Sequence, residues 1–286
     1  KSKKQPSPHL QDLSLAQLIQ AAEASLRSGA PKAAVDGLRF AVKKHGSTPE
    51  LTRHLFHAHL SHAEQLKQQG RTADAEAAAE PAGALAEDVA WLIEADLLAY
   101  LSLSSGPTAF EIYNRYVRYH RRVPEAETLL AGHLFRHRKW ALAEALDPAV
   151  PVKEEAGLVR EAMVHMDAGA WETALERLRA LPRKSAFAPV RILCRAMSSF
   201  YAENDADAVK ALSMIPEHFP LSGVAARLKE VLSAPGRSET PQEASACLSA
   251  LWEGPSVSRM EIQSLIDCLD RGRSEEHTSE LQSRQS

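Results

Sequence analysis

The feature that most constrains the fold of this chain is a pair of alanines with a constant spacing. In five segments an alanine is followed by a second alanine twelve residues later, and a sixth segment has leucine at the first position. Two antiparallel helices approach closely only where the side chains between them are small, so an alanine on each helix marks a crossing point. We therefore predict six helix pairs. Their anchor positions are Ala22 and Ala34, Ala63 and Ala75, Leu97 and Ala109, Ala131 and Ala143, Ala162 and Ala174, and Ala196 and Ala208.

The residues around the anchors also favour helices over strands. The chain is rich in Ala, Leu, Glu and Arg, which are strong helix formers. It lacks β-branched clusters with a period of two residues, so no strand is expected. Thr48 and Pro49 have the residue types that cap and open a helix. Glycines between the helical runs predict short turns at Gly29, Gly70, Gly106 and Gly169.

The spacing of the pairs resembles a known repeat family. The second alanines follow one another after 41, 34, 34, 31 and 34 residues, and 34 residues is the period of the tetratricopeptide repeat. The resemblance covers residues 15–216 and is closest over 158–216, where AGAWETALERLRALP and ENDADAVKALSMIP align without a gap. It implies an all-α fold, an α-solenoid of antiparallel helix pairs in a right-handed superhelix, with no β-sheet.

This resemblance divides the chain into four parts. We expect a disordered basic and polar tail in residues 1–12 and about six repeat units in 13–218. Irregular or capping helices are expected in 219–272, near 220–234, 241–252 and 258–270. Two departures from the family stand out. His59 and Glu127 replace the bulky residue that often opens the first helix, and Asp147-Pro148 predicts a short second helix in the fourth unit.

The end of the chain carries a different resemblance. Residues 273–283, RSEEHTSELQS, resemble the translation of a DNA sequencing adapter, with all eleven residues in one reading frame. We therefore expect residues 273–286 to be a non-native disordered tail, which implies that the natural protein was cut near Gly272. The alternative is a natural disordered tail, and in either case the segment is excluded from reasoning about the fold.

Composition bounds the environment of the protein. The formal net charge of −3 and the pI of about 6.5 give no broad attraction to nucleic acid or anionic membranes. The longest apolar run, residues 89–103, contains Glu94 and Asp96, so it is not predicted to span a membrane. Three widely spaced cysteines form no CxxC pair, which favours a reducing compartment. With no visible signal peptide, we predict a cytoplasmic protein.

Known catalytic and metal-binding signatures are missing from the sequence. There is no GxGxxG, Walker, GxSxG or HExxH motif, so we expect no catalytic residue, no metal and no cofactor. His133 and His137 have the i, i+4 spacing that can grip a metal, but two flanking arginines would repel a cation. Four other histidines share one predicted helix without that spacing, and we interpret them as a polar face. They are His54, His57, His59 and His62.

Two further features have the residue types of functional sites. Residues 113–122 mix tyrosine with arginine, as single-strand nucleic-acid surfaces do. Tyr113 and Tyr116 fall at core positions of the repeat, however, which leaves the arginines as an ordinary solvated stripe. Cys194 lies two residues before the anchor Ala196 and is predicted to be a buried thiol.

The resemblance implies a partner-binding groove lined by the first helix of each pair. Its lining is mostly apolar and includes flexible methionines, which suits a partner helix or peptide. The alternative is that neighbouring repeats, or the chain's own C-terminal helices, cover these residues. The groove positions are Glu94, Leu98, Leu101, Phe135, Arg136, Met163, Met166, Leu193, Met197, Phe200 and Tyr201.

The function that these features favour is a non-catalytic scaffold or adaptor that binds another protein or peptide. No small-molecule substrate is indicated. One alternative is the regulatory repeat arm of a larger enzyme or sensor, whose effector domain lies beyond Gly272. A second alternative is an RNA-binding helical solenoid, which needs a continuous basic face.

Overall fold

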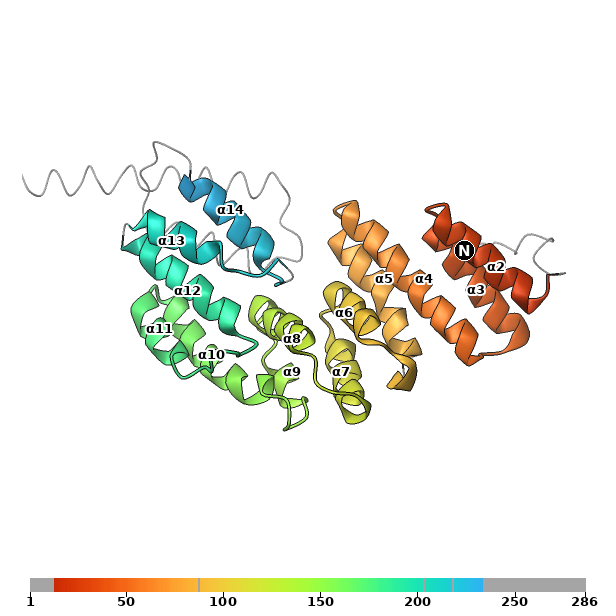
Figure 1. The fold of residues 1–286 in the computed structure, drawn as a ribbon, viewed down its shortest axis with the longest axis horizontal. Helices are drawn as coiled ribbons and strands as arrows, with labels where there is room; N and C mark the ends of the chain where they lie inside the picture. Colours follow the sequence, from red (N-terminus) through yellow and green to blue (C-terminus); the bar gives the residue numbers. More distant parts are fainter. Residues whose placement is uncertain (1–12, 87, 203, 218, 234–286) are drawn as a thin grey trace, which may run out of the picture. The chain divides into compact units, whose positions relative to one another are not determined.

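The computed structural model describes residues 13–86, 88–202, 204–217 and 219–233, and every regular element in these ranges is helical. The described chain is therefore all-α, without a strand. It forms two compact units, residues 1–121 and residues 122–286, called unit 1 and unit 2 (Figure 1). The expected tails 1–12 and 273–286 and the helices near 241–252 and 258–270 lie outside the described residues.

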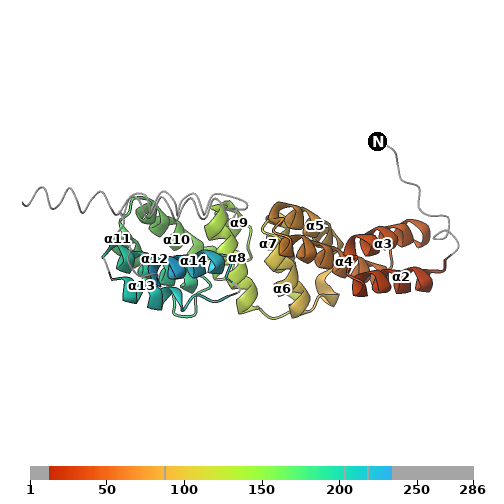
Figure 2. The ribbon, with the colours of Figure 1, turned by 90° about the horizontal axis from the view of Figure 1, so that it is seen from above.

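Unit 1 is built from helices that pack first with their sequence neighbour and then with the next pair. Helix α2 packs on α3, and α4 on α5. Helices two apart also touch, since α2 contacts α4, α4 contacts α6, and α5 contacts α7 (Figures 1 and 2). The elements are α2 (Leu15–Arg27), α3 (Pro31–His45), α4 (Pro49–Gln68), α5 (Thr72–Leu85), the 3₁₀ turn η1 (Val89–Trp91), α6 (Glu94–Leu103) and α7 (Pro107–Tyr119).

Unit 2 repeats the pairing of sequence neighbours. Helix α10 packs on α11 and α12 on α13, while α8 contacts α10 and α13 contacts α14. The prediction of a short second helix in the fourth helix pair is confirmed, because α9 has only four residues. The elements are α8 (Pro124–His137), α9 (Ala141–Glu144), α10 (Val152–Asp167), α11 (Trp171–Leu178), α12 (Ala188–Tyr201), α13 (Asp205–Leu212) and α14 (Ser222–Ser233).

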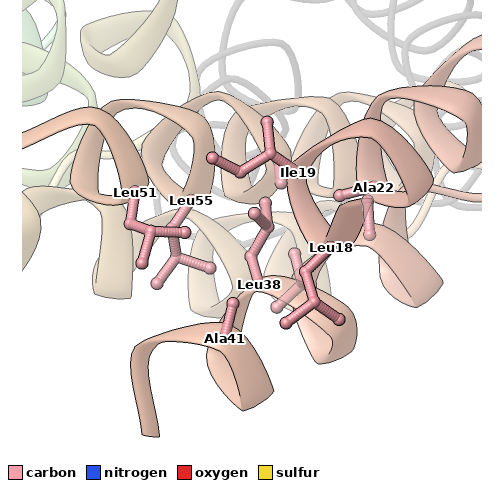
Figure 3. Packing of buried hydrophobic residues seen from close by; sticks show 10 residues of the cluster. Leu18, Ile19, Ala22, Leu38, Ala41, Leu51 and Leu55 are labelled. Carbon is pink, nitrogen blue, oxygen red and sulfur yellow. The ribbon is translucent and has the colours of Figure 1, made fainter. Parts of the chain in front are cut away.

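The anchor positions lie where the helices of each unit meet. All eleven anchor alanines and Leu97 are buried, and none of these side chains is more than 4% exposed. Figure 3 shows part of this core in unit 1, where Leu18 and Ala22 of α2 and Leu38 and Ala41 of α3 lie in one buried cluster with residues of α4. Small residues at the crossings and large ones beside them thus form one buried apolar cluster.

In four of the six predicted helix pairs, the turn between the two helices has the same hydrogen-bond pattern. The backbone N–H of a residue donates to the carbonyl five residues earlier, which is the closing bond of a Schellman cap. Each bond has the same register, because its acceptor lies three residues after the first anchor and its donor four residues before the second. The four bonds are Ala30 to Ser25 (2.9 Å), Arg71 to Leu66 (2.9 Å), Ala170 to His165 (2.8 Å) and Asn204 to Ser199 (2.9 Å).

This cap needs a left-handed residue at one position, and glycine supplies it in three turns. Gly29, Gly70 and Gly169 have φ of 75°, 76° and 71°, where an L side chain is strained. The same position of the α8–α9 turn is Arg138, with φ of 52°. Its guanidinium donates two hydrogen bonds of 2.9 Å to the carboxylate of Asp167, at the end of the next first helix. This ion pair offsets part of the backbone strain.

Candidate functional site

The predicted groove residues of unit 2 lie inside the helix packing. Six of them are at most 9% exposed, and only Arg136 and Tyr201 are half-buried. Side chains with so little exposed surface offer a partner almost no contact area unless the residues that cover them move. The buried residues are Phe135, Met163, Met166, Leu193, Met197 and Phe200.

The predicted groove residues of unit 1 are more accessible. Leu101 is fully buried, whereas Leu98 and Glu94 are half-buried on α6. The guanidinium of Arg121 lies 3.8 Å from the Glu94 carboxylate. An apolar side chain at Leu98 thus reaches the surface beside charged groups.

Histidine–carboxylate pairs connect the first helices of unit 1. His54 Nδ1 on α4 lies 4.0 Å from the Glu23 carboxylate on α2. His57 Nδ1 lies 3.6 Å from the Asp96 carboxylate on α6. Both pairs are partly exposed, so each contributes little to stability. His54 and His57 thus lie on a polar face, as interpreted from the sequence, but the same interpretation is wrong for His59, which is 3% exposed.

His59 points the other way and is buried between helix pairs. Its Nδ1–H donates to the carbonyl of Ala78 on α5 at 3.1 Å, and its Nε2 lies 3.5 Å from the Arg39 guanidinium on α3. Burial lowers the pKa of His59, and the Arg39 charge lowers it further. This imidazole is therefore a neutral link between neighbouring helices.

Buried carboxylates play the same part in unit 2. Arg122, which is exposed as expected from the sequence, donates two hydrogen bonds of 2.7 Å to the buried carboxylate of Glu127. Glu155 accepts a bond of 2.7 Å from the Ser185 hydroxyl, which precedes α12. Burial raises the pKa of Glu155, the Ser185 bond opposes the rise, and the nearby Glu127 adds to it. The Ser185 bond links α10 to the segment before α12, and the Arg122–Glu127 pair is local to the start of α8.

Cys194 has the environment of a structural thiol. It is 1% exposed, and its S–H donates to the Trp171 carbonyl at 3.7 Å. Burial raises the pKa of this thiol to about 12, so it stays protonated at neutral pH and is a poor nucleophile. The Trp171 ring stacks on Tyr201, with centroids 5.5 Å apart.

The remaining candidate residues are two histidines of α8 and the tyrosines of α7. The rings of His133 and His137 stack with centroids 6.3 Å apart. In the described ranges no group of three or more His, Cys, Asp or Glu side chains could hold a metal ion. Tyr113 and Tyr116 are buried in the core, as their repeat positions predict, while Tyr119 is 71% exposed.

A contact that the sequence analysis did not foresee involves Gly132 in the middle of α8. A Cβ at this position would lie 2.6 Å from Cγ of Pro220, closer still to its Cδ, and 3.0 Å from Phe219. Phe219 and Leu221 are each 1% exposed. The segment of residues 219–221, called the strap, thus lies against α8 (Figure 1).

A sequence signal for this contact exists at the residue after the first anchor. In five of the six helix pairs this position has a large residue, and only in the pair that begins with α8 is it glycine. A helical glycine costs about 1 kcal/mol relative to alanine, so its presence points to a close approach. The five large residues are Glu23, Glu64, Leu98, Met163 and Met197.

No helix within the described part of the chain is long and apolar enough to cross a membrane. Comparisons of the chain with protein-family models, with curated proteins and with solved structures found no match.

Proposed function

We propose that this chain is a non-catalytic scaffold that binds another protein through tetratricopeptide-like helix pairs. The observation that supports this proposal is the repeated turn, in which four caps have one hydrogen-bond register relative to the alanine anchors. Units with one internal geometry stack on their neighbours and expose a continuous face along the stack. Contacts between helices two apart in unit 1 agree with such stacking.

The chemistry of the buried polar groups also favours binding over catalysis. His59, Glu127 and Glu155 each contact a group on a different helix or connection. The contacts of His59 with Arg39 and of Glu155 with Ser185 link neighbouring helix pairs, whereas Glu127 binds Arg122 beside the start of its own helix. The Cys194 thiol is kept protonated by burial. These residue types often perform catalysis, but here their positions serve packing.

We place the partner-binding face of unit 1 around Leu98. This half-buried apolar side chain lies on a first helix, beside Glu94 and the His57–Asp96 pair. Apolar contact at the centre with charged groups around it is the usual composition of a protein interface. The partner is therefore expected to present an apolar side chain flanked by charges.

Affinity capture with the whole chain as bait tests this proposal. The variants are Leu98→Lys and a matched control, Met214→Lys, at a methionine that is 62% exposed on unit 2. A protein retained by the wild type and by Met214→Lys, but lost from Leu98→Lys, is the expected result. Identical partners on all three baits would contradict the Leu98 face, and a bait that retains nothing would contradict the scaffold.

A further inference from the structure

The strap lies against one of the first-helix positions of unit 2 at which the tetratricopeptide resemblance implies partner contacts. Gly132 is equivalent to Met163 and Met197 of the next two helix pairs, because each lies one residue after the first anchor. Phe219 and Pro220 fill the space above this glycine. Chain from the far end of unit 2 thus lies where a partner would lie.

The strap has the properties of a bound ligand. Phe219 is 1% exposed, although it lies in a connection between α13 and α14. Its N–H donates to the Pro216 carbonyl at 3.0 Å, and its carbonyl accepts from Ser222 at 2.8 Å. These local bonds give the strap a turn of its own. Its side chains at Phe219 and Pro220 lie against the bare backbone of Gly132 in α8.

We propose that the notch over Gly132 is a binding site for an aromatic–proline pair, filled in cis by Phe219 and Pro220. A partner segment with the same pair competes with the strap for this site. The inference rests on the proposed scaffold function and adds the site and the chemistry of the partner in unit 2. A tethered segment has a high effective concentration, so the strap makes the site respond only to a partner that displaces it.

The first test uses hydrogen exchange on two glycine variants of the whole chain. Gly132→Ala puts a methyl group into the space of Pro220, whereas Gly157→Ala, in α10, meets nothing within 4 Å. We expect the amides of Phe219 and Ser222 to exchange faster in Gly132→Ala, with α8 and α10 still protected. Gly157→Ala should leave the strap amides as in the wild type. Equal strap exchange in both variants would overturn the proposal.

The second test adds the ligand in trans. A fluorescein-labelled peptide of residues 215–222 (IPEHFPLS) is titrated by anisotropy into the wild type, Gly132→Ala and Phe219→Ala/Pro220→Ala. Emptying the notch should lower the apparent Kd at least about tenfold relative to the wild type, because the competing strap is removed. Gly132→Ala, whose notch is filled, should not bind. A peptide with alanine in place of Phe219 and Pro220 is the control.

A third measurement tests the proposal even if the Phe219→Ala/Pro220→Ala variant fails to fold. Excess peptide added to the wild type should speed exchange of the strap amides, while the control peptide should not. No effect of the peptide, or equal binding by the filled and empty notches, would overturn the proposal. If Leu98→Lys still loses a partner in that case, the strap inference fails and the scaffold proposal stands.

Discussion

The first helices of the two units treat the same repeat position in opposite ways. In unit 1 the residue after the first anchor is Glu23, Glu64 or Leu98, and each is at least partly exposed. In unit 2 it is Gly132, Met163 or Met197, and all three are buried. One helix-pair geometry thus carries an accessible face with two glutamates and one leucine in one unit, and a covered apolar face in the other. The pairing of helices does not decide which face is open, because that depends on what lies across it.

A buried charge should separate the two faces most strongly. Met163→Lys places an ammonium group in the core of unit 2 and should cost on the order of 3–5 kcal/mol. Leu98→Lys should cost less than about 1 kcal/mol, because a half-buried lysine extends its charged end into water. Urea denaturation followed by circular dichroism measures both. Similar losses in the two variants would contradict the contrast between the faces.

The helix crossings, in contrast, should respond alike in the two units. Ala174→Phe in unit 2 and Ala75→Phe in unit 1 both overpack a buried crossing, and each should cost roughly 1–3 kcal/mol. Ala99→Phe, at an exposed position of α6, is the control and should change stability little. A melting temperature that falls in only one of the two anchor variants would show that the crossings differ.

Acidification should act on the two units with opposite sign. The folded pKa of His59 lies below its unfolded value of 6.5, so the unfolded chain binds the extra proton as the pH falls below 6.5 and unit 1 loses stability. The folded pKa of Glu155 lies above 4.5, so its destabilising effect at neutral pH disappears as the pH falls through that pKa. Each slope is at most about 1.4 kcal/mol per pH unit.

Hydrogen exchange at several pH values between 7.5 and 4.5 resolves the units separately. His59→Gln should flatten the acid loss in unit 1, and Glu155→Gln should remove the relief in unit 2. If either variant keeps the wild-type pH dependence of exchange, the substituted residue does not cause the pH dependence of stability in its unit.

The smallest expected difference lies in the turns. Gly70→Ala in unit 1 should cost about 1 kcal/mol, because its backbone is left-handed although the space for a Cβ is open. Arg138→Gly in unit 2 should change stability by less than that, since relief of the same strain opposes loss of the Asp167 pair. Thermal unfolding of both variants measures this. A large loss in Arg138→Gly would mean that the ion pair dominates.

Local features of the fold could be predicted from the sequence. The alanine spacing located positions that are all buried, Thr48 caps α4 through Leu51, and Asp147-Pro148 follows the short α9. These features depend on residues close together in the chain or on side-chain size at one crossing. The helix expected near 220–234 is confirmed as α14.

The accessibility of the candidate site could not be predicted in the same way. Whether Met163 is open depends on neighbours from other helices and connections, and the strap contact joins residues nearly ninety positions apart. No local pattern encodes such a contact. Its one trace is Gly132, where a helix tolerates a poor helix former because Pro220 lies against it.

The fixed register of the turns has a consequence for changes in chain length. The two anchors of a helix pair are always twelve residues apart. The distance from the last anchor of one pair to the first anchor of the next pair varies from 19 to 29 residues. Insertions and deletions are thus accommodated between units, and a frame-preserving insertion near Gly46 should leave the pairs intact. One added residue between Gly29 and Ala34 would instead rotate α3 by about 100° and turn its buried face toward water.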